Sequence, residues 1–421
     1  MKGLGHLIAF ALAALQLTGC VGRGTEAGSL TFSPDGQRVC HIRENRIEEK
    51  VVDGDILSRS INLHWCSTTD PTKESSVHID TLGLEYKGYI DVGTEVRWSP
   101  RGSRIGVMTR QKLTVVVVDS GSKTDIRDGT ITSFAWLSDS ELAYHTCRTT
   151  GDTSRRVIVR VDLGAEQKTD AFVFPERPKE SSIGAGHWSP CGKFLIVMEP
   201  VVRGQYYCVS VAAGTARSFG QTDSYDVGVA WTSDSSRAFC VSNKVGPADH
   251  YAATLLTMET GTTVDCSREF QATFAGHSPG VEPLWTADGK YVLVNALQIS
   301  GHLVQPAPWQ AVPLGKMVAP GFAPPNQWSS INPWLFRLPV PGWVGVVPTG
   351  NYGDSPVLFV SDYSGRSVRA LLKDYPFALS PDGTNVASID PHGQVTVRKL
   401  DKWWLSSAEA PPFRKPGKQG R

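Results

Sequence analysis

The sequence predicts an all-β fold assembled from repeated units of four antiparallel strands. Three observations lead to this prediction. A five-residue turn cassette recurs along the chain, each copy lies between apolar runs of strand length, and no long segment has the 3.6-residue apolar period of a helix. Repeated four-stranded antiparallel units are typical of a β-propeller. We expect a single propeller with no helices, with eight blades favoured and seven as the alternative.

The turn cassette is an aromatic residue or leucine followed by Ser-Pro-Asp-Gly or a close variant. Proline presets φ for a type I turn, aspartate hydrogen-bonds the backbone just downstream, and glycine accepts a positive φ at the exit. The clearest copies are residues 32–36, 98–102, 188–192, 285–289 and 379–383. Two weaker copies, residues 136–140 and 231–235, end in serine. Their exits are therefore expected to be strained or to use another turn type.

A degenerate eighth copy is predicted between residues 289 and 379, where the gap is nearly twice the usual spacing. The segment Leu338-Pro-Val-Pro-Gly342 has the same register and the same final glycine, and the apolar run 343–347 follows it. If this copy is not a true unit, the propeller has seven blades and a long insertion.

A third alternating strand follows the cassette and second strand in most units. In three units it ends in an aspartate, at Asp119, Asp162 and Asp362. Together with the cassettes, these aspartates resemble the Pro-Asp repeats of TolB-type β-propellers, relatives of the WD-repeat class. The resemblance covers nearly the whole chain after residue 29 and implies a propeller fold. Propellers of this kind serve as scaffolds, transport partners and enzymes, so the resemblance does not specify a function.

The N-terminus has the pattern of a secretory signal. The apolar run 7–15 is too short to span a bilayer of roughly 30 Å, and Leu17-Thr-Gly-Cys20 follows it. This tetrapeptide resembles a bacterial lipobox, in which cleavage before Cys20 leaves a thiol that carries a diacylglyceryl group. An ordinary signal peptide with an incidental cysteine is the alternative. The lipobox predicts a location in the bacterial cell envelope, with the propeller facing the periplasm or the exterior.

The predicted organisation has four parts. They are a lipoprotein signal peptide (1–19), a lipidated tether (20–28), the β-propeller (29–405) and a disordered basic tail (406–421). The 42 basic and 41 acidic residues give a net charge of +1, which does not suit a nucleic-acid-binding protein. The expected partners are a membrane, through Cys20, and a protein or glycan, and the expected state is a monomer.

The cysteines permit disulfides but do not predict a thiolate metal site. Cys40 and Cys66 fall on predicted neighbouring strands of the first unit and form the candidate disulfide pair. Cys147, Cys208 and Cys240 lie within apolar strands, where small buried side chains are expected. No Cys-x-x-Cys spacing occurs.

The sequence contains no convincing catalytic constellation. Residues 276–280 match Gly-x-Ser-x-Gly, but Pro279 lacks the backbone N–H that an oxyanion hole would need. The ten histidines are scattered, and no His-Glu-x-x-His is present. His187 and Arg97 each precede a cassette tryptophan on a predicted first strand and are candidate channel-lining residues. We expect no catalytic residue, no metal and no cofactor.

The stretch 300–350 is the most unusual part of the chain, with ten of the 27 prolines and several aromatic residues. A proline-rich loop on a rigid scaffold is a common place for function. Trp309, Phe322 and Trp328 are therefore candidate residues of a partner-binding loop, although aromatic residues here could instead cap the core. Residues 43–60 form the other insertion, which is predicted to be an extended hairpin with a polar tip.

Two function classes follow. The favoured one is an envelope-anchored bacterial lipoprotein whose β-propeller is a binding scaffold for a protein or glycan partner. The alternative is a propeller-fold polysaccharide lyase or hydrolase acting in the envelope.

Overall fold

The computed structural model divides the chain into two compact units. The described residues are 27–47, 58–83, 94–109, 112–178, 186–199, 204–222, 227–244, 250–274, 283–296, 299–313, 334–337, 343–347, 358–362, 368–372, 377–390 and 393–400. Within them, the strands form eight antiparallel sheets in which strand order follows chain order, apart from one short extra strand. The predicted all-β fold of propeller blades is confirmed.

The first unit contains five sheets, counting the C-terminal one. The first sheet has β1 (Ala27–Phe32), β2 (Arg38–Ile47), β3 (Ser58–Ser67) and β4 (Glu74–Gly83). The second has β5 (Glu95–Trp98), β6 (Arg104–Met108), β7 (Leu113–Val117) and β8 (Lys123–Ile126). The third has β9 (Thr130–Trp136), β10 (Glu141–Thr150), β11 (Thr153–Asp162), β12 (Gln167–Val173) and the short β13 (Arg177–Pro178). The fourth has β14 (Gly186–Trp188), β15 (Phe194–Glu199), β16 (Gly204–Ser210) and β17 (Thr215–Thr222). The C-terminal sheet has β30 (Phe377–Leu379), β31 (Asn385–Ile389) and β32 (Val395–Lys399).

The second unit contains three sheets and a short helix. Its first sheet has β18 (Val227–Trp231), β19 (Arg237–Lys244), β20 (His250–Thr257) and β21 (Thr262–Asp265), followed by α2 (Ser267–Thr273). The next has β22 (Leu284–Trp285), β23 (Val292–Ala296), β24 (Ile299–Pro306) and β25 (Trp309–Pro313). The last has β26 (Trp334–Arg337), β27 (Trp343–Val347), β28 (Leu358–Asp362) and β29 (Val368–Leu372).

The degenerate eighth copy is confirmed as a sheet. β26 and β27 flank residues 338–342 and pair in antiparallel register, with Arg337 opposite Val344. The cassette itself lies outside the described residues. In contrast, the prediction of no helices is wrong, because α2 follows β21 and buries Phe270 against the second unit's core. At seven residues it is too short to produce a recognisable helical period in the sequence.

The cassettes fold as the sequence predicts. In the first, the Gly36 amide donates to the Ser33 carbonyl at 2.9 Å and the Arg38 amide donates to Ser33 Oγ at 2.9 Å. The same pattern recurs around Ser380 and Thr286. The final glycines of the five clearest copies all have φ between 64° and 71°. Glycine favours these turns because an L side chain is strained in that region.

The two serine-ended cassettes follow the two routes that were predicted for them. Ser235 keeps the turn and adopts a φ of 61°, a strained value for a residue with a side chain. In the other copy the Leu137 and Ser138 amides both donate to the Glu141 carbonyl, at 2.9 and 3.0 Å, and Ser140 avoids positive φ.

Four cassette tryptophans hydrogen-bond to the sheet that precedes theirs. Trp136 Nε1 donates to the Arg97 carbonyl at 3.0 Å in the first unit, and Trp285 Nε1 donates to the Ala230 carbonyl at 3.0 Å in the second. Trp98 reaches the Thr31 carbonyl at 3.4 Å, and Trp188 reaches Ser133 Oγ at 3.0 Å. The aromatic residue of the cassette therefore supplies both apolar area and a directed hydrogen bond between blades.

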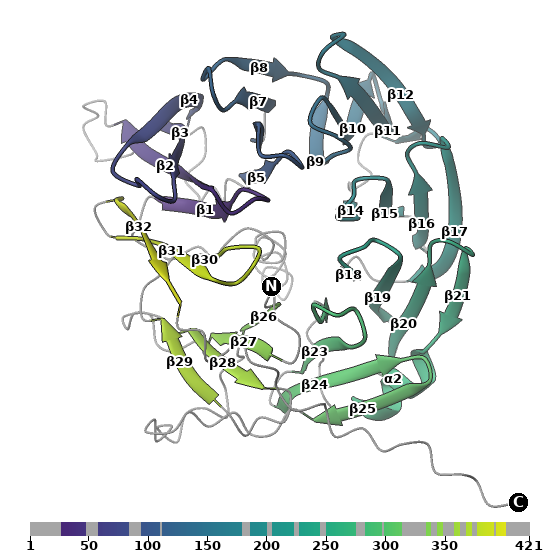
Figure 1. The fold of residues 1–421 in the computed structure, drawn as a ribbon. Coiled ribbons are helices and arrows are strands. Elements are labelled where there is room, and N and C mark those ends of the chain that lie inside the picture. The colour runs from purple at the N-terminus through teal and green to yellow at the C-terminus, as the bar shows by residue number, and fades with distance from the viewer. Residues whose placement is uncertain are drawn as a thin grey trace, which may run out of the picture. The chain divides into compact units, whose positions relative to one another are not determined.

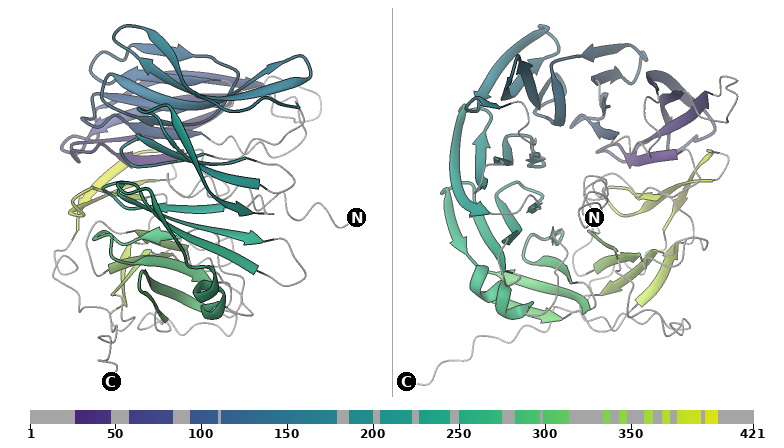
Figure 2. Two further views of the ribbon diagram at one scale, coloured as in Figure 1. Left: turned by 90° about the vertical axis from the view of Figure 1, so that its right-hand side faces the viewer. Right: turned by 180° about the vertical axis from the view of Figure 1, so that it is seen from behind.

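Apolar clusters fill the spaces between neighbouring sheets of the first unit. Cys40, Ile42 and Leu63 of the first sheet pack with Ile105 of the second. On the opposite face of the first sheet, Val39 and Cys66 pack with Ala387 and Ile389 of the C-terminal sheet. Figure 1 shows the C-terminal sheet in yellow beside the first sheet in purple, and Figure 2 shows the same neighbours from behind.

The proposed Cys40–Cys66 disulfide is wrong. Cys66 lies opposite Val39 in the β2–β3 ladder, and Cys40 lies opposite Trp65. Because side chains alternate along a strand, this register places the two thiols on opposite faces of the first sheet. Both cysteines are free and buried, one in each of the clusters described above.

The β2–β3 ladder also confirms the extended hairpin, since pairing continues out to Ile47 and Ser58. The tip, residues 48–57, lies outside the described residues. The described part of the chain contains no helix with the length and hydropathy that crossing a bilayer requires.

Candidate functional site

The two candidate channel-lining residues come within electrostatic reach of each other in the first unit. Arg97 on β5 forms an ion pair with Glu95, and its guanidinium carbon lies 5.7 Å from the centre of the Phe134 ring. His187 on β14 is half-buried. Loss of solvent and, secondarily, the charge of Arg97 lower the pKa of His187 to about 4, so this imidazole is neutral at pH 7. Their channel-lining role remains a prediction.

Trp309 is the one residue of the candidate partner-binding loop that lies within the described part of the chain. It begins β25, where its indole Nε1 donates to Thr273 Oγ1 at 3.2 Å and its ring meets Phe270 edge-on at 6.0 Å. These contacts attach it to α2 and to the apolar core of the second unit. The structure thus gives Trp309 a packing role. Phe322, Trp328, Cys20 and the 276–280 motif lie outside the described residues.

Three metal-ligating side chains converge on the first sheet, where the sequence did not indicate a site. His41 on β2, His64 on β3 and Glu74 on β4 form what we call the histidine–glutamate group. His41 Nε2 lies 2.7 Å from Glu74 Oε1, and His64 Nδ1 lies 3.0 Å from Glu74 Oε2. The two imidazoles stack with their ring centres 5.1 Å apart and their planes 21° from parallel.

The strands position this group by simple register. His41 and His64 are directly opposite in the β2–β3 ladder, and Glu74 lies two positions before Ser76, the residue opposite His64 on β4. Such diagonal neighbours are within reach of long side chains on the same face. The group therefore occupies the face of the first sheet that packs against the C-terminal sheet, as Val39 and Cys66 do.

Charge and burial define the protonation state of the group. Burial opposes ionisation of Glu74, but hydrogen bonds from His41 and His64 outweigh it and hold the pKa of this carboxyl well below its usual range. Burial also lowers the pKa of His41, and Glu74 offsets part of this effect. At neutral pH the group is thus a carboxylate facing His41 as a neutral imidazole.

Arg43 borders the histidine–glutamate group and links it to the C-terminal sheet. Its guanidinium NH2 group donates to the Gly393 carbonyl at 2.6 Å and lies 3.6 Å from Glu74 Oε2. The arginine thus supplies a positively charged partner for the carboxylate. It also fixes the turn between β31 and β32 against β2.

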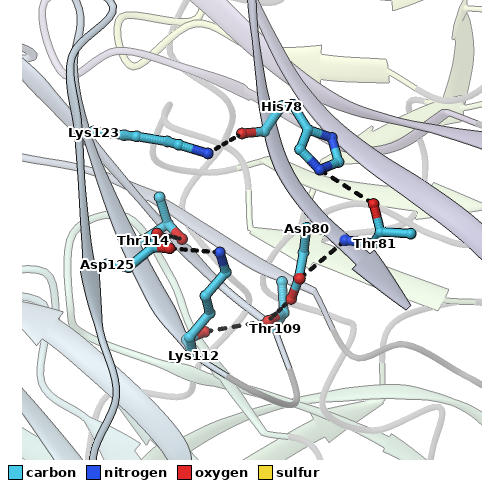
Figure 3. Close-up of polar contacts among 8 residues, drawn as sticks. All are labelled: His78, Asp80, Thr81, Thr109, Lys112, Thr114, Lys123 and Asp125. Carbon is cyan, nitrogen blue, oxygen red and sulfur yellow. Dashed lines mark hydrogen bonds and ion pairs between the residues drawn. The ribbon is translucent and has the colours of Figure 1, made fainter. Parts of the chain in front are cut away.

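A second polar cluster lies between β4 and the second sheet and joins them by hydrogen bonds. Lys112, whose side chain is 5% exposed, lies 2.7 Å from Asp125, which also accepts from Thr114 at 2.8 Å. Asp80 accepts from the Thr109 hydroxyl at 2.9 Å (Figure 3). Each of these charges is matched by a partner at hydrogen-bond distance, which is what buried polar groups require for stability.

The chain is similar at low sequence identity to solved structures that include a β-propeller domain. No protein-family model and no curated protein sequence matches the chain. The β-propeller domain of the Trilobed protease from Pyrococcus furiosus is 13% identical with a TM-score of 0.47, over 83% of this chain and 96% of that one. The tricorn protease is 13% identical with a TM-score of 0.45, over 89% of this chain, which spans 42% of that protein. TolB from Acinetobacter baumannii is 11% identical with a TM-score of 0.36, over 73% of this chain and 79% of that one. Likeness at this level does not indicate a function.

Proposed function

We propose that the protein is an envelope-anchored bacterial lipoprotein whose β-propeller is a binding scaffold for a protein or glycan partner. The observation that carries the proposal is the short distance in sequence between Leu17-Thr-Gly-Cys20 and the first strand, which begins at Ala27. Seven residues of extended chain span at most about 25 Å. A lipid on Cys20 would therefore hold the propeller next to the membrane surface.

The contacts of the cassette residues and of Arg97 are consistent with a scaffold that binds a partner elsewhere on its surface. The cassette side chains are committed to turns and to hydrogen bonds between sheets, and Arg97 is paired with Glu95. Among the described residues, the three-residue metal-ligating group lies on β2–β4 and not around Arg97 and His187. Segments that interrupt a repeat pattern in the sequence, such as the proline-rich stretch that holds Phe322 and Trp328, are natural places for a partner to bind.

Replacing Cys20 by serine is expected to abolish lipid attachment, because serine lacks the thiol that accepts the diacylglyceryl group. Cells are grown with a clickable fatty-acid analogue, and label on the immunoprecipitated protein is measured together with its share in the membrane fraction. The matched control is Cys191→Ser, in the third clear cassette, which should label as the native chain does. Full labelling of Cys20→Ser would show that the lipoprotein assignment is wrong.

Shortening the proline-rich stretch is expected to reduce partner capture by at least about tenfold, since loss of an aromatic anchor, here Phe322, at an interface costs about 2 kcal/mol or more. The variant removes residues 316–327, which leaves β25 and Trp309 in place. Capture is measured by cross-linking in detergent-solubilised envelopes and by pull-down of cell-wall glycan, with quantitative mass spectrometry. The control removes residues 50–55 from the tip of the β2–β3 hairpin. Equal capture by the native chain and the 316–327 variant would place the binding surface elsewhere.

A further inference from the structure

We propose that His41, His64 and Glu74 bind a divalent transition-metal ion of the Zn²⁺ class and that the ion cross-links β2, β3 and β4. The proposal rests on the convergence of two imidazole nitrogens and one carboxylate, whose ligand atoms all lie within 4.8 Å of one another. It departs from the expectation of no metal, and it does not depend on lipid anchoring or on the identity of a partner.

The donor set matches the coordination chemistry of zinc and its neighbours. Imidazole nitrogen suits Zn²⁺, Cu²⁺, Ni²⁺ and Fe²⁺, and a set of two histidines and one carboxylate is a recurrent three-ligand site for such ions. Calcium and magnesium instead prefer sites built of oxygen atoms alone. The two histidines therefore favour a transition metal over an alkaline-earth ion.

The ligand atoms lie within 4.8 Å of one another and must adjust to accept the ion. Metal–ligand bonds of about 2.0–2.1 Å in a tetrahedral site place ligand atoms roughly 3.3 Å apart. The contacts of His41 with Glu74 Oε1 and of His64 with Glu74 Oε2 are 2.7 and 3.0 Å and must open by a few tenths of an ångström. Ligand atoms that lie further apart, up to 4.8 Å, must close toward that spacing, which rotation of the side chains allows. The Glu74 side chain is 26% exposed and has room to move, and it gives the ion a path from solvent.

Proton exchange explains how the same three residues can serve with and without the ion. Without it, His41 and His64 hydrogen-bond the carboxylate through Nε2 and Nδ1. When the ion binds, the proton of each neutral imidazole moves to the other ring nitrogen, and binding weakens at low pH because a doubly protonated imidazole has no nitrogen free to bind a metal. The other nitrogen of His41, Nδ1, is buried without a hydrogen-bond partner. No contact at Nδ1 therefore fixes the tautomer, and Nε2 is able to exchange its proton for a metal.

Arg43 lies beside the proposed metal site and contacts its carboxylate ligand. Its charge lies 3.6 Å from Glu74 Oε2 and competes with an incoming cation. The 2.6 Å hydrogen bond to the Gly393 carbonyl gives the guanidinium a partner that it retains once the ion takes the carboxylate. Three protein ligands leave a fourth position for water, the arrangement found in sites that stay open to solvent.

The test is zinc titration of the purified full chain in mild detergent, with any affinity tag removed and residual metal extracted by a chelator. Calorimetry is expected to find one Zn²⁺ per chain. Glu74→Gln and His64→Ala are each expected to weaken binding by at least about 100-fold, because even residues behind the ligands change metal affinity by 10–100-fold. Co²⁺ in place of Zn²⁺ should give visible absorption bands that both variants lose.

Matched controls remove the same chemical groups elsewhere in the first unit. His78→Ala deletes an imidazole from β4 that hydrogen-bonds Ser60 and Thr81, and Glu141→Gln neutralises a carboxylate paired with Arg160. Both should bind Zn²⁺ as the native chain does. Saturating Zn²⁺ should also raise the thermal unfolding midpoint of the native chain and of His78→Ala by several degrees, and should leave Glu74→Gln unchanged.

Glu74→Gln keeps the shape of the native side chain, so it remains informative if alanine at the buried His41 or His64 prevents folding. Circular dichroism of each variant without metal establishes that it is folded. The proposal is overturned if the native chain binds no stoichiometric Zn²⁺, or if a folded Glu74→Gln variant binds it with native affinity. Loss of binding in His78→Ala would equally overturn it, because the ion would then lie elsewhere.

Discussion

Replacing Trp285 by alanine is expected to lower the free energy of unfolding by about 3–5 kcal/mol, the usual cost of truncating a buried aromatic side chain to alanine. Trp285 is 1% exposed and is the largest fully buried side chain among the described residues. Its Nε1 donates to the Ala230 carbonyl at 3.0 Å, and the guanidinium carbon of Arg237 lies 4.9 Å from the centre of its ring. Alanine removes the apolar contact, the hydrogen bond and the cation–π contact together. Urea denaturation followed by circular dichroism measures the loss.

Two companion variants separate these contributions. Trp285→Phe keeps an aromatic ring in the cluster but loses the hydrogen bond between sheets, so we expect a smaller loss of about 1 kcal/mol from that bond. Trp309→Ala truncates a half-buried indole of the same unit and is expected to cost less than Trp285→Ala. A Trp285→Ala protein as stable as the native chain would mean that the cassette tryptophan does not hold neighbouring sheets together.

Local features of the sequence were sufficient to predict the repeating part of the fold. The cassettes combine residues whose turn preferences do not depend on distant contacts, so their glycines at positive φ could be foreseen. Alternating apolar strands supplied the four-stranded units, and the constant register of the cassette located the β26–β29 sheet despite the altered residues 338–342. The helix α2 escaped prediction because its packing through Phe270 and Phe274 depends on the sheets around it.

Register explains why the histidine–glutamate group could not be predicted. A disulfide between Cys40 and Cys66 on neighbouring strands would suit a ladder in which they lie opposite each other, and such a ladder would place His41 opposite Trp65. The real ladder is shifted by one residue, and this shift separates the cysteines and places His41 opposite His64. A slip of one position exchanges the two faces of a strand, and periodicity alone does not define it. Predicting that Glu74 lies beside both histidines would also have required the register of β4 against β3.

The sequence predicted the positions of the candidate channel-lining residues better than those of the candidate partner-binding residues. Trp309 was grouped with Phe322 and Trp328 because all three lie in one proline-rich stretch. The β24–β25 ladder continues through Trp309 to Pro313, so the sheet extends further into that stretch than its proline content suggested. For Arg97 and His187, the position before the cassette tryptophan correctly placed both on first strands. The ion pair between Arg97 and Glu95 was not predicted from the sequence and is seen only in the structure.

Replacing Gly192 by alanine is expected to destabilise the protein by at least about 3 kcal/mol, well above the cost of its backbone conformation alone. Gly192 has a φ of 71°, and an L residue in that left-handed region loses about 1–2 kcal/mol. A Cβ atom here would lie 2.3 Å from the Trp136 carbonyl oxygen, a backbone atom of the preceding cassette. Because backbone cannot rotate away as a flexible side chain can, the third and fourth sheets of the first unit must separate locally. The cost therefore includes lost packing between sheets as well as strain.

Gly121→Ala is the matched control for this prediction, since the two sites share a conformation and differ in their surroundings. Gly121 has a φ of 66°, and an added Cβ would meet nothing within 4 Å, so only the backbone cost of about 1–2 kcal/mol is expected. The comparison is made by urea denaturation of both variants under the same conditions. Ser235 supports the reasoning, because its cassette tolerates a side chain at φ 61°. A glycine at this position is thus indispensable only where the preceding cassette touches it. Equal losses for Gly192→Ala and Gly121→Ala would mean that conformation alone, and not the contact between cassettes, requires glycine at residue 192.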